Sequence, residues 1–206
     1  VTSIGENAFN NCRVLTKAIL PEGISEIKVE TFKDCVKLKI VKIPETVTKI
    51  CKRAFNCCNS LVDITIPASV NSIASNPFSN CQQLQSIIVD ENNQYFTSID
   101  GVLFNKNISH LIACPCTKWD YVIPSSVTSI GELAFFQCKL LDSVVIPSSV
   151  SSIEHNAFCG CTALKSVTIP FGVTSISYGL FSECTSLETV VIPASVTEID
   201  NYAFED

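Results

Sequence analysis

The sequence predicts a solenoid, a coil of short turns stacked along one axis. The first observation behind this prediction is a phrase with the consensus V-T-S-I-x-x-x-A-F-x-x-C-x-x-L-x-x-V-x-I-P-x-x, which recurs every 23 residues. Its copies begin at Val1, Ile24, Val47, Val70, Val127, Val150, Val173 and Val196. The second observation is a short alternating apolar run in each copy, and the third is a set of unbroken apolar columns. A period in this range is typical of units that bury their apolar faces against neighbouring units.

The alternating run is L-x-x-V-x-I-P, which has the period of a half-buried strand. We expect stacked copies to pair in parallel and to form one continuous sheet of a right-handed superhelix. The predicted strands include Val144–Ile146, Val167–Ile169 and Val190–Ile192. The proline that follows each strand lacks an N–H group and turns the chain out of the sheet.

The remaining part of each repeat is expected to cross the convex side. V-T-S-I predicts a second short extended edge, and A-F-x-x-C is too short for a full helix, so we expect a turn or a single 3-10 or α turn there. The phenylalanine, leucine and isoleucine columns are predicted to form the core, because one repeat alone cannot bury them. The phenylalanine column consists of Phe9, Phe32, Phe55, Phe78, Phe135, Phe158, Phe181 and Phe204.

The repeat follows the leucine-rich-repeat pattern L-x-x-L-x-L, with a cysteine in the ladder position. More narrowly, Pro124–Leu141 and Pro147–Leu164 carry the phrase P-x-x-V-x-S-I-x-x-x-A-F-x-x-C-x-x-L, which resembles the BspA-like class of leucine-rich repeats. The resemblance covers nearly the whole chain and implies an α/β-type leucine-rich repeat solenoid. It also implies a non-catalytic adhesion or recognition protein of the kind found on bacterial surfaces and in parasitic protists. The cysteine-rich form resembles the protist members more than the bacterial ones.

Twelve cysteines raise the question of disulfides. Seven share one column and are expected to be reduced, buried and hydrogen-bonded to carbonyls of the turn: Cys12, Cys35, Cys58, Cys81, Cys138, Cys161 and Cys184. The other five fall at variable phases, and several are expected to be exposed, with their redox state left open: Cys51, Cys57, Cys114, Cys116 and Cys159. Exposed free thiols favour a reducing compartment, hence the cytoplasm. The family resemblance favours the cell surface as the alternative.

The sequence carries no signal for a metal, a cofactor or catalysis. Cys114-Pro-Cys116 lacks the C-x-x-C spacing of common zinc sites, and His110 and His155 lie at unrelated phases of the repeat. There is no glycine-rich phosphate loop, and the carboxylates are scattered over different phases. No apolar run approaches the roughly 18–20 residues of a membrane-spanning helix.

The repeat is interrupted once, by an insertion at residues 90–123, within what we expect to be a single domain over residues 1–206. Val102–Phe104 and His110–Ala113 predict a hairpin around a polar turn. The insertion holds the only tryptophan, Trp119, together with Tyr121. These aromatic residues either fill a small core of the insertion or anchor a partner, so they form the alternative binding site.

Charge is distributed unevenly along the chain. Residues 1–62 carry ten Lys/Arg and six Asp/Glu, a net charge of +4, whereas residues 63–206 carry four and fourteen, a net charge of −10. The outward side chains of the predicted sheet are β-branched, small or, at one end, basic, which suits a protein partner. The candidate binding residues are Lys17, Lys39, Lys42, Thr65, Ile88, Val145, Thr168 and Val191.

These patterns predict a protein-binding module without chemistry of its own. The alternative is an intracellular scaffold, a spacer or a regulatory subunit within a longer chain. Nucleic acid is excluded as a partner, because the basic patch is small, lacks interleaved aromatic residues and belongs to a chain with a net charge of −6.

Overall fold

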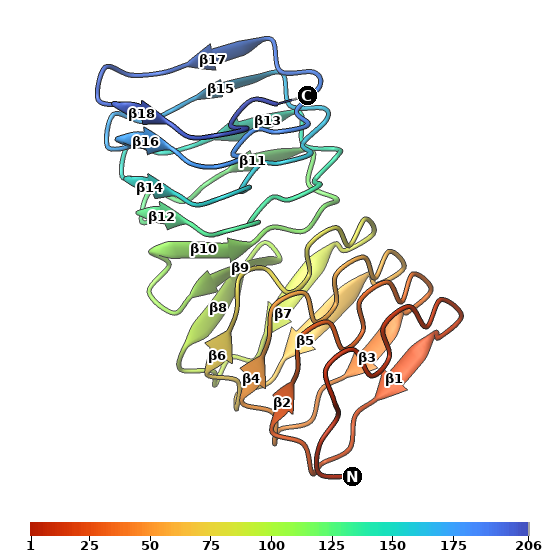
Figure 1. Cartoon of the computed structure of the whole chain (residues 1–206). Helices are drawn as coiled ribbons and strands as arrows, with labels where there is room; N and C mark the ends of the chain where they lie inside the picture. The colour runs from red at the N-terminus through yellow and green to blue at the C-terminus, as the bar shows by residue number, and fades with distance from the viewer. Residues whose placement is uncertain (206) are drawn as a thin grey trace.

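The computed structural model describes residues 1–205 and shows a solenoid whose regular turns follow the predicted repeats (Figure 1). Each regular turn contributes two short strands, so two ladders of strands run along the molecule. The first ladder, from the L-x-x-V-x-I run, contains β1 (Lys17–Ile19), β3 (Ile40–Lys42), β5 (Asp63–Ile66), β7 (Ser86–Val89), β11 (Asp120–Val122), β13 (Ser143–Val145), β15 (Ser166–Thr168) and β17 (Thr189–Val191). The second ladder contains β2 (Glu26–Ile27), β4 (Lys49–Ile50), β6 (Ser72–Ile73), β10 (His110–Ala113), β12 (Ser129–Ile130), β14 (Ser152–Ile153), β16 (Ser175–Ile176) and β18 (Glu198–Ile199).

The expectation of one continuous parallel sheet is wrong. Strands do pair in parallel one repeat apart, as in β1–β3 and β2–β4, but they do so in two ladders. From the second copy onward, the V-T-S-I segment is extended enough for two of its residues to pair in each regular turn, which creates the second ladder. In addition, β8 (Phe96–Ile99) and β9 (Val102–Asn105) form an antiparallel hairpin that joins β10. The first-ladder strands also lie one residue earlier than predicted, because β13 spans Ser143–Val145.

The expectations of an α/β-type solenoid and of a 3-10 or α turn on the convex side are also wrong, since residues 1–205 contain no helical segment. Two residues in most convex segments have a left-handed backbone, for example Asn7 at φ 57° and Asn11 at φ 62°. A right-handed helix requires negative φ at successive residues. The N–H groups of these segments instead donate to the next turn, as Phe32 does to the carbonyl of Ala54 at 2.8 Å. These inter-turn bonds replace those that a helix would make.

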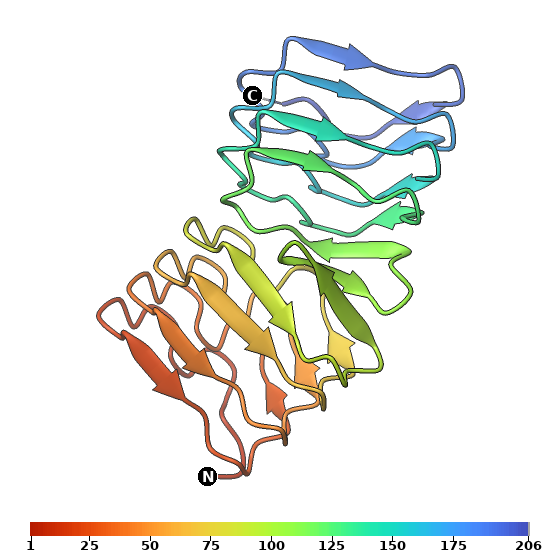
Figure 2. The same ribbon diagram turned by 180° about the vertical axis from the view of Figure 1, so that it is seen from behind.

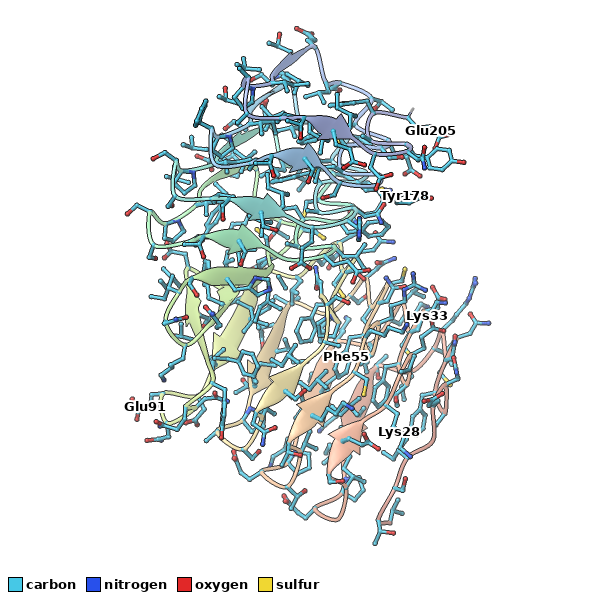
Figure 3. The ribbon with its side chains drawn as sticks, turned by 60° about the vertical axis from the view of Figure 1, so that its left-hand side comes forward. Lys28, Lys33, Phe55, Glu91, Tyr178 and Glu205 are labelled. Carbon is cyan, nitrogen blue, oxygen red and sulfur yellow. The ribbon has the colours of Figure 1, made fainter. Side chains whose placement is uncertain are left out.

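The apolar columns form the core in the inner turns, as predicted, whereas Phe9, Phe204 and Ile199 in the end turns are exposed. Phe55, labelled in Figure 3, lies inside the N-terminal turns. Phe32 and Phe55 are fully buried, and their rings stack with centroids 5.5 Å apart. The same stacking recurs between Phe135 and Phe158 at 4.8 Å. The phenylalanine stack is nevertheless split in two, because the rings from Phe9 to Phe78 and those from Phe135 to Phe204 form separate runs.

The split divides the solenoid into an N-terminal arm (residues 1–92) and a C-terminal arm (residues 127–205), which point in different directions with the hairpin between them (Figure 1). Side chains of β9 alternate between the two cores: Leu103 belongs to the N-terminal cluster, whereas Val102 and Phe104 belong to the C-terminal cluster. The predicted hairpin is confirmed by the antiparallel pairing of β9 with β10. It acts as a partition that closes the end of both cores.

Candidate functional site

The strands of the first ladder lie side by side in the view of Figure 2. Their outward side chains form an extended surface, which we call the sheet face. Its backbone is fixed by the parallel pairing, so the side chains project at regular intervals. The eight residues named from the sequence as candidates on the predicted sheet are all exposed. The apolar members are well exposed, with Ile19 at 62%, Ile88 at 45% and Val145 at 56%. The face is therefore partly apolar and solvent-accessible along both arms.

The N-terminal end of the sheet face is basic. Lys17, Lys39 and Lys42 lie on or directly beside β1 and β3 and are exposed. None of the ion pairs found among residues 1–205 involves these three side chains. Their charges therefore act outward and are available to an acidic partner, with a strength that salt will reduce.

Trp119 belongs to the same face as the lysines, although the sequence places it in the insertion. The carbonyl of Trp119 accepts a bond from the N–H of Asp142 at 2.7 Å, as the carbonyl of Thr16 accepts one from Lys39 at 2.9 Å. Trp119 and Lys39 thus occupy equivalent positions, just before the first-ladder strand. The two candidate sites are therefore two regions of one surface.

The two aromatic residues of the alternative site have different environments. Trp119 is 68% exposed, whereas Tyr121 is 9% exposed and lies in the C-terminal core beside Phe135. Burial raises the pKa of the Tyr121 hydroxyl well above its usual range. Of the pair, only Trp119 presents its ring to solvent.

Sequence reasoning missed the acidic middle of the sheet face. The tip of the β8–β9 hairpin abuts β7, where the N–H of Ile87 donates to the carbonyl of Gly101 at 2.9 Å. Beside it, a depression of about 440 Å³ is lined by Asp100, Lys118, Trp119 and Asp120, so two carboxylates face one ammonium group there. Placing Tyr121 in the strand phase would have located Asp120 on the face. Asp100 had no such signal, because a hairpin tip lies outside the repeat.

No cysteine of the column forms a disulfide, as predicted. Six of the seven are buried, as predicted, and Cys12 is half-buried. Five of the column's thiols donate to the carbonyl of the phenylalanine one turn back, as Cys58 does to Phe32 at 3.2 Å, whereas the Cys138 thiol donates to the carbonyl of Cys114 at 3.8 Å. Burial raises the pKa of Cys35 to about 11. The expectation that several of the other five cysteines are exposed is wrong, because Cys114, Cys116 and Cys159 are buried and Cys51 and Cys57 are half-buried.

Within residues 1–205, no group of three or more His, Cys, Asp and Glu side chains is arranged to hold a metal ion. That part of the chain also contains no helix with the length and apolar character needed to cross a membrane.

Comparison with known proteins gives a family match and several structural matches. A family model described as the BspA type leucine rich repeat region, in six copies, matches residues 2–118 and 106–206. A solved leucine rich cell surface protein from Faecalibacterium prausnitzii A2-165 is 34% identical with a TM-score of 0.87, over 97% of this chain and 53% of that one. A leucine-rich repeat protein from Eubacterium ventriosum ATCC 27560 is 29% identical with a TM-score of 0.81, over 96% and 58%. No curated protein matches the chain.

The pneumococcal vaccine antigen PcpA shares the fold, with 23% identity and a TM-score of 0.70 over 90% of this chain and 56% of that one. The chain spans less than two thirds of each of these three solved proteins.

Proposed function

Because the chain belongs to the BspA-type leucine-rich repeat family, we propose that it is a non-catalytic module that binds another protein through its sheet face. The observation that carries this proposal is the exposure of β-branched apolar side chains and one tryptophan along a rigid ladder. Exposed apolar surface of this kind marks interaction sites, and tryptophan is enriched among residues that dominate binding. The side chains of this face can vary without changing the fold, because their backbone is held by the neighbouring turns.

We further propose that the module serves adhesion or recognition at a cell surface, as part of a longer protein. The solved relative with 34% identity is described as a cell surface protein. The expectation of a cytoplasmic location relied in part on exposed thiols, but none of the twelve cysteines is exposed. Buried thiols are protected from oxidants, so the cysteine content is compatible with an oxidising environment.

The basic end of the face favours an acidic partner, and Trp119 supplies an aromatic anchor some turns away. A partner captured from extracellular matrix or lysate should be titrated against three variants at low and moderate salt. Lys17/Lys39/Lys42→Glu should weaken binding at low salt, and the difference should shrink as salt rises. The control variant Lys37/Lys52/Lys139→Glu makes the same charge change outside the sheet face.

Trp119→Ala separates the two regions of the face. If this change abolishes binding in a folded protein while the face lysines have no effect, the acidic middle of the face is the contact region. If neither variant differs from the control, the sheet face is not the binding surface, and a spacer or scaffold role becomes the better interpretation.

A further inference from the structure

The second ladder contains an open strand edge at the junction of the two arms. β6 pairs with β4 on one side, but β10 pairs with β9 and β12 and leaves β6 without a partner on the other side. The N–H groups of Ser72 and Ala74 donate to the carbonyls of Thr48, just before β4, and Ile50, at 3.1 and 3.0 Å. In a parallel ladder, the N–H and carbonyl of the intervening residue, Ile73, point the other way. No hydrogen bond within residues 1–205 is found for those two groups.

The corresponding edge of the first ladder is covered. The N–H of Ile87 in β7 donates to Gly101, and the N–H of Val89 donates to the Ser98 hydroxyl at 3.2 Å. The hairpin therefore closes one ladder and leaves the other open. Open edges within a sheet are templates for an added strand, and proteins usually cover them.

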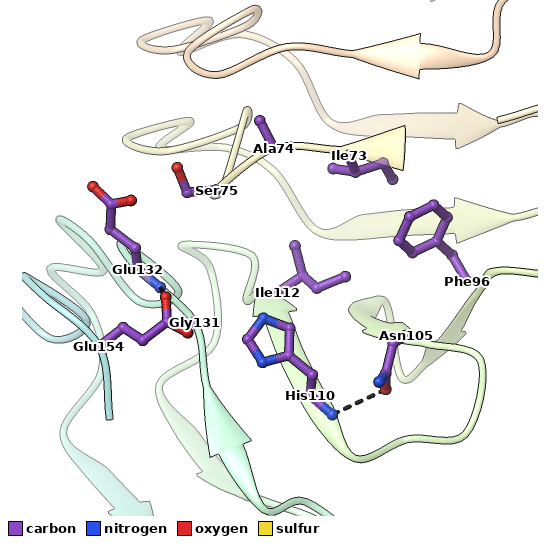
Figure 4. A pocket seen from close by; sticks show the side chains of 10 residues that line it. All are labelled: Ile73, Ala74, Ser75, Phe96, Asn105, His110, Ile112, Gly131, Glu132 and Glu154. Atoms are coloured by element: carbon purple, nitrogen blue, oxygen red, sulfur yellow. Dashed lines mark hydrogen bonds between the residues drawn. The ribbon is translucent and has the colours of Figure 1, made fainter. Parts of the chain in front are cut away.

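A cleft of about 240 Å³ lies directly against the open edge (Figure 4). Ile73, Phe96 and Ile112 supply its apolar wall. Ile73 is half-buried, whereas Ile50 in the turn before it and Ile130, the next isoleucine of the column, are fully buried. In a regular turn, the next isoleucine of the column would pack beside Ile73. Here an apolar side chain of a bound partner could occupy that place.

The rim of the cleft is acidic. Glu132 and Glu154 lie at one end, and the Glu154 carboxylate accepts the N–H of Glu132 at 3.0 Å, which holds it at the rim (Figure 4). The imidazole of His110 lies between this rim and Asn105, with Nδ1 2.7 Å from the Ser129 hydroxyl. No lysine or arginine lines the cleft. The rim therefore favours a cationic group next to the apolar one.

We propose that the cleft binds an extended peptide segment with alternating apolar and basic residues, which adds to β6 as a parallel strand. The N–H and carbonyl of Ile73 can hydrogen-bond to a peptide backbone. The apolar wall can pack against an apolar side chain that points into the cleft, and the two glutamates can attract the basic side chain next to it. In the regular turns, the N–H groups that bond to the preceding turn belong to outward-facing residues such as Ser72. The N–H groups of the basic residues in the peptide therefore bond to β6.

The first test uses a fluorescent heptapeptide of alternating valine and lysine, titrated by anisotropy at pH 8. Glu132→Gln/Glu154→Gln should weaken binding about tenfold or more, since hydrogen bonds to charged groups are lost. Glu198→Gln/Glu205→Gln makes the same charge change on exposed residues outside the cleft and should have little effect. Equal losses in both variants would mean non-specific attraction and would overturn the proposal.

The second test changes the peptide and leaves the protein intact. N-methylation of the lysine residues should weaken binding about tenfold or more, whereas N-methylation of the valine residues should be tolerated, because only one set of N–H groups faces β6. Similar affinities for the two methylated peptides, or the reverse preference, would show that the peptide does not add to β6.

Residue-resolved amide exchange locates the contact. The N–H of Ile73 should exchange fast in the free protein and at least about tenfold more slowly with the peptide bound, whereas that of Ser72 is already bonded in the free protein. Unchanged exchange at Ile73 in the saturated complex would rule out strand addition at this edge. Lys17/Lys39/Lys42→Glu should leave peptide binding intact, which separates this site from the sheet face.

Discussion

Replacing Phe158 with alanine should destabilise the protein strongly, because this ring is the centre of the C-terminal stack. The side chain is fully buried, and its ring stacks on Phe135 at 4.8 Å and on Phe181 at 5.6 Å. Emptying a large aromatic core site costs about 3–5 kcal/mol. Two ring contacts are lost at once, each of them worth about 0.5–1.5 kcal/mol beyond burial. We therefore expect a loss in the upper half of that range.

Urea unfolding monitored by circular dichroism measures this loss as a lower midpoint. Phe171→Ala is the matched control, since Phe171 is the same residue type in the same arm but is 75% exposed. The control should change the free energy of unfolding by less than about 0.5 kcal/mol. Similar midpoints for Phe158→Ala and the native protein would show that the phenylalanine column does not form the core.

Two further predictions concern the hairpin and the thiols. Gly101→Ala should cost roughly 1–3 kcal/mol of stability, because Gly101 has φ +78° and an added Cβ would lie 2.9 Å from the Cα of Ser86 in β7. Gly5→Ala is the control, since its added Cβ meets nothing within 4 Å. Equal melting temperatures for the two variants would refute the contact between Gly101 and β7. Burial raises the pKa of Cys35 and Cys159 from 9.0 to about 11, so stability should be full below about pH 9 and should fall as pH rises toward 11, because the unfolded chain loses its thiol protons first. Urea midpoints at pH 8 and pH 10.5 with reductant measure the fall, and a Cys35→Ala/Cys159→Ala variant that falls as steeply would assign it to other groups.

The repeat columns could be predicted from the sequence because each column has one structural environment in every turn. Phe55 and Cys58 illustrate this, since both are fully buried at the predicted phase. The convex turns were harder, because left-handed backbone falls on residues as different as Glu30, Arg53 and Leu133. Hydrogen bonds between turns stabilise these conformations, and no local sequence signal marks them.

The features around the insertion could be predicted only in part. The run Val102–Phe104 indicated a strand, but its burial between two cores depends on how the arms meet. The same holds for the open edge of β6, since Ser72–Ile73 has the same local pattern as the second-ladder strands of other turns. Trp119 was singled out by residue type, yet only the pairing of β11 with β13 places it on the sheet face with Lys39.

The most direct test of binding through the sheet face is a titration of the captured partner against Thr65→Arg/Thr168→Arg. Both threonines are exposed on the face, one in each arm, so two long charged side chains would obstruct any partner that spans it. Thr2→Arg/Thr174→Arg makes the same change at exposed positions outside the first ladder and serves as the control. We expect the face variant to lose at least about tenfold in affinity and the control to stay close to the native protein. Native affinity in the face variant, together with a loss in the control, would contradict binding through the sheet face.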